Sequence, residues 1–150
     1  MEDIIAKFGQ YVDKQLLMKP ETARKELILG YKAFNLKLKY APDKKLSPAR
    51  QYLAKVCMEN HISSFQDAEN SAIISVFLPC EILQSFGIKA LFAEGFSGYI
   101  TGAYAEKALI EAAEAAGIAE TYCSYHKIIM GAAMTGILPR PRFIVNTSVA

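Results

Sequence analysis

Two short apolar runs in residues 72–94, separated by eight residues, constrain the fold more than any other feature of the chain. The first run, AIISVFLP, is rich in β-branched residues, and the second, IKALFAE, ends in an acidic residue. Continuous apolar runs of this length are typical of buried parallel strands. The intervening CEILQSFG predicts a short helix that ends at Gly87. Strand, helix, strand is the minimal unit of a parallel α/β fold.

The segments that follow extend the same pattern. GFSGYITG, residues 95–102, predicts a glycine-rich turn, and AYAEKALIEAAEAAG predicts a helix over residues 103–117. A further helix is expected within residues 121–136, and FIVNTSVA predicts a third strand. We therefore expect residues 71–150 to form a Rossmann-like α/β domain with a parallel sheet, whose strands point their carboxyl ends toward any site.

The first 70 residues predict helices only. Apolar residues recur at three- and four-residue steps in residues 1–17, which indicates an amphipathic helix. Pro20 suits the first turn of a second helix, and Ser47 followed by Pro48 suits the start of a third. We expect residues 1–70 to form a helical segment that packs on the α/β domain.

Length and composition favour a soluble globular protein. The chain has 150 residues, of which 52% are hydrophobic and 21% charged, and this balance argues against disorder. No apolar run approaches the roughly 18 to 20 residues that a membrane-spanning helix needs. The N-terminus is charged throughout and does not resemble a signal peptide. We expect a cytoplasmic location and no membrane partner.

Charge is distributed unevenly along the chain. Residues 1–50 contain 11 Lys and Arg against 6 Asp and Glu, whereas residues 51–150 contain 6 against 9. The lysines of the first part recur at helical spacing, which favours a solvated helix face. Because no arginine-rich or aromatic-interleaved stripe accompanies them, we expect no nucleic-acid binding.

Cys123 and His126 are the most conspicuous candidate site residues. They lie one helical turn apart in TYCSYHKIIMGAAMTG and so face the same way. They could be half of a metal site, a nucleophile with its base, or a structural pair, and the positive end of a helix favours a thiolate in the first two cases. Zinc needs about four ligands, and His61, Cys57 and Cys80 supply no second half-site of standard spacing. No oxyanion hole or orienting third residue is recognisable for a hydrolytic dyad.

Two carboxylates are expected at the carboxyl ends of strands. Glu81 begins the helix after the first apolar run, and Glu94 ends the second run. The helix dipole alone favours a carboxylate at the position of Glu81. The same position is also where α/β proteins build sites, so an acid–base role is admissible. The glycines of GFSGYITG lack the spacing of a dinucleotide-binding loop and favour a tight turn.

The order of these segments resembles one protein family. LPCEILQSFGIKALFAEGFSGYITG is followed by an Ala- and Glu-rich helix and then by YCSYHKIIMGAAMTGILPRPRFIVNTS. Over about residues 70–150 this order resembles the N-terminal domain of the 2-hydroxyacyl-CoA dehydratase family. That family includes the 2-hydroxyglutaryl-CoA dehydratase D-component, benzoyl-CoA reductase relatives and double-cubane-cluster proteins. PCEILQSFG follows the family segment P-x-E-L-(L/I)-x-A-x-G, except that Ser85 replaces the alanine. The N-terminal helices match only in general character.

The resemblance implies an iron–sulfur site. Family members hold a [4Fe-4S] cluster between Rossmann-like domains, typically through three cysteines, and the first of these corresponds to Cys123. The second would follow the third strand, just beyond Ala150, and the third would lie in a later domain. The chain is therefore expected to be the N-terminal part of a longer enzyme and inactive alone. Ser124 and His126 would donate hydrogen bonds beside the cluster, and Glu81 would lie near the substrate.

The implied reaction is the reductive, radical elimination of water from a 2-hydroxyacyl-CoA, a lyase activity of anaerobic metabolism. The expected partners are the acyl-CoA substrate, an ATP-dependent activator protein that delivers an electron, and a related second subunit or a second copy of the chain. Two alternatives stay open. One is a related benzoyl-CoA reductase or double-cubane-cluster reductase domain. The other is a non-enzymatic α/β interaction module, in which Cys123 and His126 pack in the core.

Overall fold

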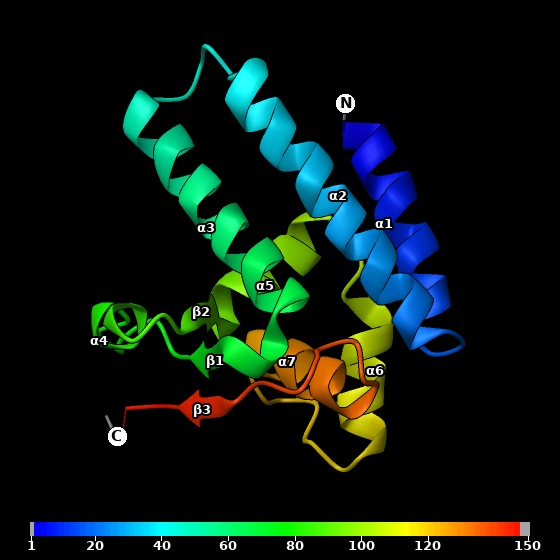
Figure 1. Cartoon of the computed structure of the whole chain (residues 1–150). Helices are drawn as coiled ribbons and strands as arrows, with labels where there is room; N and C mark the ends of the chain where they lie inside the picture. The colour runs from blue at the N-terminus through cyan, green and yellow to red at the C-terminus, as the bar shows by residue number, and fades with distance from the viewer. Residues whose placement is uncertain (1, 148–150) are drawn as a thin grey trace.

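The chain forms a mixed α/β structure with a small parallel sheet. The computed structural model describes residues 2–147, and side chains from Ile4 onward. The elements are α1 (Glu2–Leu16), α2 (Pro20–Tyr40), α3 (Pro48–Gln66), a 3₁₀ turn (Ala68–Asn70), β1 (Ser71–Ile74), α4 (Glu81–Ser85), β2 (Lys89–Phe92), α5 (Ala93–Gly102), α6 (Lys107–Ala115), α7 (Ser124–Met134) and β3 (Phe143–Val145). Figure 1 shows the N-terminal helices on one side and the strands on the other. The predicted α/β class is confirmed.

The three strands are parallel, with β1 in the centre and the order β2-β1-β3. Ile74 is in register with Phe92 on one side and with Val145 on the other, so all three strands end at the same edge. β2, the next strand along the chain, pairs with one side of β1, and β3 pairs with the other side. In open parallel sheets, such a reversal of strand order marks the edge where ligands bind.

One core joins the helical segment to the α/β part. It contains buried side chains from α1, α2, α3, β2, α5, α6 and α7, among them Leu16, Leu27, Met58, Leu91, Phe96, Leu109 and Ile128. A smaller cluster of Ala72, Ile74 and Ala90 lies between the sheet and α4. Burial of these apolar groups is the main favourable contribution to folding.

Local signals place the first helices where the sequence predicts them. Pro20 is the first residue of α2 and Pro48 the first residue of α3. Ser47 accepts a hydrogen bond from the Arg50 amide through Oγ, at 3.3 Å. Proline has no amide hydrogen, so in the first turn of a helix, where amide hydrogens lack intrahelical partners, it leaves none unpaired. Together with a serine that caps a following amide, it favours a helix start independently of tertiary structure.

The prediction of a turn at residues 95–102 is wrong, because this segment is most of α5. Phe96 and Ile100, four residues apart, are fully buried on one face of the helix. Their burial outweighs the cost of about 1 kcal/mol that each helical glycine imposes. The acidic residue expected at the end of β2, Glu94, consequently belongs to the first turn of α5.

The first strand is also shorter than predicted. β1 ends at Ile74, and residues 75–78 form a turn in which the Leu78 amide donates to the Ser75 carbonyl at 3.1 Å. Both neighbouring strands end in register with Ile74, so residues beyond it have no ladder partner. Val76 and Phe77 are exposed as a result.

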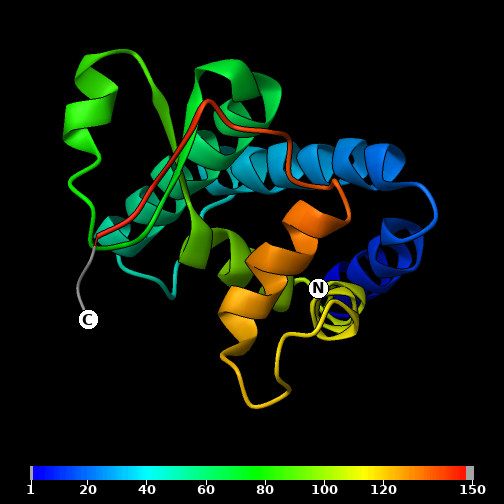
Figure 2. The same cartoon turned by 90° about the horizontal axis from the view of Figure 1, so that it is seen from below.

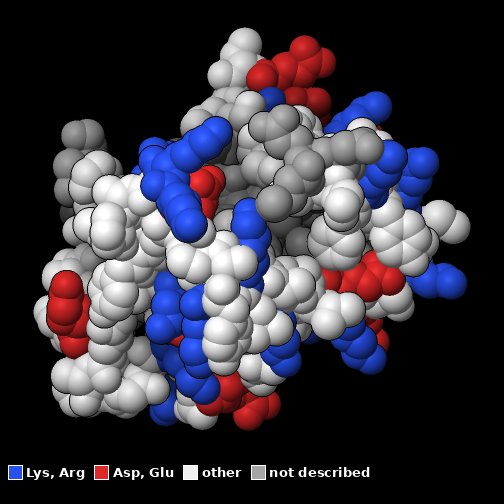
Figure 3. All heavy atoms as spheres, turned by 90° about the horizontal axis from the view of Figure 1, so that it is seen from above, with Lys and Arg blue, Asp and Glu red and all other residues white. Residues whose placement is uncertain are grey.

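Basic side chains lie mainly at the surface. Figure 3, which looks down on the molecule from above, shows lysine and arginine side chains across this face with acidic side chains among them. Lys32, Lys39, Lys44 and Lys45 are exposed, as expected of a solvated helix face and its connecting loop.

Candidate site at the start of α7

Cys123 lies at the start of α7 with its side chain exposed. It is the N-cap residue, and its carbonyl oxygen accepts the amide of Lys127 at 3.0 Å. The Cys123 side chain forms no capping hydrogen bond with the described residues of this helix. The first amide N–H groups of a helix lack partners within it, so they attract an anion placed beside them. Cys123 therefore presents a thiol at the positive end of a helix.

Ser124 and His126 occupy the first turn beside Cys123, and both are exposed. The ring centroids of His126 and Tyr122 lie 5.7 Å apart. Among the described residues, no hydrogen bond joins Cys123 to His126. The interpretation of Cys123 and His126 as core residues is wrong, because α7 buries Lys127, Ile128, Gly131 and Ala132 instead.

A hydrogen bond fixes the start of α7 on α5. Ser97 is fully buried, and its Oγ donates to the carbonyl oxygen of Tyr125 at 2.7 Å. A Cβ atom added to Gly98 would lie 3.7 Å from Cε1 of Tyr125, so α5 contacts the first turn of α7 directly. α5 follows β2 without a loop, and Figures 1 and 2 show α5 beside α7. The position of Cys123 is thus linked to the carboxyl edge of the sheet.

A buried lysine that the sequence analysis missed anchors the same turn from the other side. Lys127 is 4% exposed, and its Nζ donates to Glu114 Oε1 at 2.6 Å and to the Glu120 carbonyl at 2.9 Å. These contacts join α6, the connecting loop and α7 just after Cys123. The available signal was a lysine directly before the apolar run Ile128, Ile129 and Met130.

The structure does not bring the three cysteines together. Cys57 lies half-buried in α3, and burial raises the pKa of its thiol. Cys80 precedes α4, and its thiol pKa is raised by burial and by the charge of Glu81. Within the part of the chain that the structure describes, no group of three His, Cys, Asp or Glu residues could hold a metal ion. Cys123 is therefore a single candidate ligand.

The two candidate carboxylates occupy different environments. Glu81 is the exposed first residue of α4, and α4 lies well apart from the start of α7 in both views (Figures 1 and 2). Glu94 accepts a hydrogen bond from the Val76 amide through Oε2, at 3.1 Å. Glu94 therefore holds the turn after β1 against the first turn of α5.

His61 is a buried residue of α3, in contrast to the exposed residues Cys123, Ser124 and His126 at the start of α7. Its Nδ1 lies 2.6 Å from the Cys57 carbonyl, and burial lowers its pKa. A neutral ring with Nδ1–H donating to this carbonyl accounts for the contact. Nε2 then has no partner among the described residues. The ring packs against Tyr99, with centroids 5.2 Å apart, so His61 is a core residue.

Comparison of the chain with protein-family models, with curated proteins and with solved structures gives no match. Among the described helices, none has the length and apolar character required to span a membrane.

Proposed function

We propose that the chain is an iron–sulfur domain of the 2-hydroxyacyl-CoA dehydratase type, in which Cys123 is a cluster ligand. The observation that carries the proposal is the exposed thiol at the uncapped N-terminus of α7. Iron–sulfur clusters are held by cysteine thiolates, and a helix N-terminus offsets part of their negative charge. The fold of three parallel strands with intervening helices is compatible with the Rossmann-like domain that the resemblance implies.

The described residues fit one position of such a site and not a complete ligand set. Cys57 lies in α3 and Cys80 precedes α4, and among the described residues no group of three His, Cys, Asp or Glu that could hold a metal ion includes Cys123. The remaining ligands would come from another polypeptide or from residues outside those described. Tyr122 and Tyr125 flank Cys123 and are 47% and 43% exposed, so this surface could pack against a related second subunit or a second copy.

The residues around Cys123 support specific roles in this proposal. When bound, the cluster would pass an electron, supplied by an ATP-dependent activator protein, to the thioester of an acyl-CoA. Ser124 and His126 stand in the first turn and could donate hydrogen bonds to cluster sulfur, which tune its potential. Ser97 and Lys127 hold that turn in position. Glu81 would act on the substrate only if the acyl-CoA extended across to α4.

Anaerobic reconstitution tests the ligand directly. The chain is incubated with ferrous iron, sulfide and a small thiol that can complete the coordination, and is then separated by gel filtration. We expect the protein fraction to retain iron, acid-labile sulfide and sulfide-to-iron absorption. Cys123→Ser should lose at least about 80% of the retained iron, because the thiolate is the preferred ligand type.

Cys57→Ser and Cys80→Ser are the matched controls, since each removes one thiol from another element. Both should retain as much iron as the unmodified chain. The ligand proposal fails if Cys123→Ser retains the same amount of iron as the unmodified chain, or if the unmodified chain retains none.

A further inference from the structure

The outer face of α2 carries a line of exposed side chains at heptad spacing. Its members follow one another at alternating steps of four and three residues: Lys25, Leu29, Lys32, Leu36 and Lys39. We call these five residues the α2 stripe. All five are exposed, Leu29 by 67% and Leu36 by 57%. This alternation keeps side chains in one line along a helix, and it is the spacing through which a second helix packs in a coiled coil.

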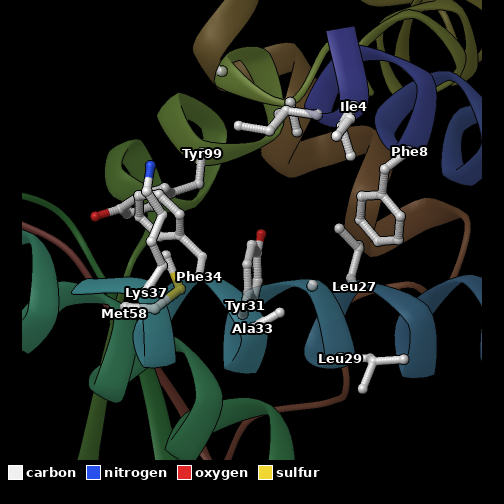
Figure 4. A pocket seen from close by; sticks show the side chains of 14 residues that line it. Ile4, Phe8, Leu27, Leu29, Tyr31, Ala33, Phe34, Lys37, Met58 and Tyr99 are labelled. Atoms are coloured by element: carbon white, nitrogen blue, oxygen red, sulfur yellow. The ribbon is translucent and has the colours of Figure 1, made fainter. Parts of the chain in front are cut away.

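The α2 stripe lies on the side of the helix that faces away from the core. Ala23 and Leu27 are buried, and each precedes a member of the stripe by two positions. Two positions correspond to about 200° around a helix, so the buried side chains and the stripe point in nearly opposite directions. Figure 4 shows Leu29 on the other side of α2 from Leu27 and Tyr31. The packing of α2 against α1 and α3 therefore leaves the stripe accessible.

The stripe carries three positive charges. Within the described part of the chain, Lys25, Lys32 and Lys39 form no ion pair. Glu26, next to the stripe, accepts a hydrogen bond from the Tyr11 hydroxyl of α1 through Oε1, at 3.2 Å. No acidic residue belongs to the stripe itself. A surface that covers the stripe must therefore supply negative charge, because a covered ammonium group without a counter-charge is costly.

A second copy of the chain and a bilayer both fit the stripe poorly. If two stripes packed in parallel, each lysine would face a lysine, and if they packed antiparallel, each lysine would face a leucine. Neither arrangement gives the ammonium groups a counter-charge. Helices that lie on membranes keep their apolar and cationic side chains on different faces, whereas lysine and leucine alternate within one line of α2.

We propose that the α2 stripe docks an acidic amphipathic helix of a partner protein. In that helix, acidic side chains face the three lysines, and apolar side chains face Leu29 and Leu36. The paired charges fix register and orientation, and the leucines lose contact with water. α2 has 21 residues, enough for about three heptads. The stripe lies on a different helix from the one that follows Cys123, so the proposal goes beyond the cluster site and does not depend on it.

Two fluorescein-labelled synthetic peptides test the proposal on the whole chain. Each repeats one heptad about three times, with glutamate at one seam position, leucine at the other, and alanine and glutamine elsewhere. One peptide has leucine at the first seam position, for the parallel orientation, and the other has the reverse order, for the antiparallel orientation.

Fluorescence anisotropy at about 50 mM salt should show saturable one-to-one binding of at least one of these peptides, and about 500 mM salt should weaken this binding at least threefold, because exposed charges are then screened. The proposal is overturned if neither peptide binds saturably. It is also overturned if peptides with lysine in place of every glutamate bind equally well.

A charge reversal tests the lysines. Lys32→Glu, at the centre of the stripe, should weaken peptide binding at least about tenfold, because attraction to the facing glutamate becomes repulsion. A peptide with lysine in place of that glutamate should restore the affinity to within about threefold. Lys44→Glu is the matched control, since it changes the net charge equally in the exposed loop after α2, and it should weaken binding less than about twofold. Unchanged affinity in Lys32→Glu overturns the proposal.

A truncation tests the leucines. Leu36→Ala should weaken peptide binding about three- to tenfold, because less apolar surface leaves water on contact. Leu53→Ala is the matched control, since Leu53 is 63% exposed on α3, outside the stripe, and it should leave the affinity unchanged. Equal losses in the two variants contradict docking along the stripe.

Two further measurements address the competing occupants. If analytical ultracentrifugation shows a dimer that Leu36→Ala abolishes and that excludes both peptides, the stripe is an interface between copies and the proposal is overturned. If vesicles of phosphatidylserine and phosphatidylcholine bind the unmodified chain but not Lys32→Glu, and neither peptide binds, the stripe is a membrane-binding face and the proposal is likewise overturned. A monomer that binds a glutamate peptide and does not bind these vesicles supports the proposal.

Discussion

Lys127 Nζ lies 2.6 Å from Glu114 Oε1, and the lysine side chain is 5% exposed while the glutamate side chain is 30% exposed. A buried ammonium group without its partner carries a large desolvation cost, whereas the pair together is tolerated. The contact joins α6 to α7 one helical turn after Cys123, and Lys127 also donates to the Glu120 carbonyl at 2.9 Å. The position of the candidate ligand therefore depends on a charge pair that is largely removed from water.

Removing the carboxylate should destabilise the fold. We expect Glu114→Gln to lower the free energy of unfolding by about 2–3 kcal/mol, because Lys127 stays buried without a counter-charge. Urea denaturation followed by circular dichroism measures the change. Glu111→Gln is the control, since its pair with Lys107 is largely exposed and should contribute at most about 0.5 kcal/mol. Equal effects of the two substitutions would contradict the structural role of Glu114.

Asp13 of α1 caps a helix that lies far away in the sequence. Its Oδ1 accepts a hydrogen bond from the Ala108 amide, in the first turn of α6, at 2.9 Å. Asp13→Ala should therefore cost about 1 kcal/mol of unfolding free energy, as loss of a helix cap typically does. Asp13→Asn retains an acceptor oxygen and should cost less than half as much in the same denaturation measurement. An equal loss in both variants would indicate that the charge of Asp13, and not the cap, is stabilising.

Gly131 lies where α7 crosses α6. A Cβ atom at this position would lie 2.0 Å from the Leu109 carbonyl oxygen, so any side chain forces the two helices apart. We expect Gly131→Ala to destabilise the protein by about 3 kcal/mol or more. At Gly102 in α5, an added Cβ meets nothing within 4 Å. Gly102→Ala should be neutral or stabilising by up to about 1 kcal/mol. Thermal denaturation of both variants tests the close crossing.

His61 should make stability depend on pH. Burial lowers its pKa in the folded protein below the ordinary value of 6.5, so the unfolded chain binds the proton more readily. The stabilisation is fully present above about pH 6.5 and is lost as the pH falls below it, by at most about 1.4 kcal/mol per pH unit. Urea midpoints measured between pH 7.5 and pH 5.5 should decrease.

His61→Phe keeps an aromatic ring beside Tyr99 and should remove most of this dependence on pH. A decrease of the same size in His61→Phe would assign the effect to other groups.

Some features could be predicted because their causes are local. The α/β class follows from apolar runs and their spacing, and the starts of α2 and α3 follow from prolines and a capping serine within a few residues. The segment 95–102 could not be predicted in this way. Its glycines favour a turn locally, and only burial of Phe96 and Ile100 against distant elements makes it a helix.

The candidate site residues also combine properties with local causes and properties that depend on tertiary contacts. The chemical character of Cys123 and its place before a helix are readable from neighbouring residues, but its exposure depends on which face of α7 packs against α5 and α6. The cap at Asp13 and the charge pair of Lys127 join residues that are 95 and 13 positions apart in the chain. The sequence by itself determined the strand and helix pattern, because neighbouring residues decide capping and periodicity. Only the tertiary structure decided which polar groups are buried or paired, because burial depends on segments that meet through folding.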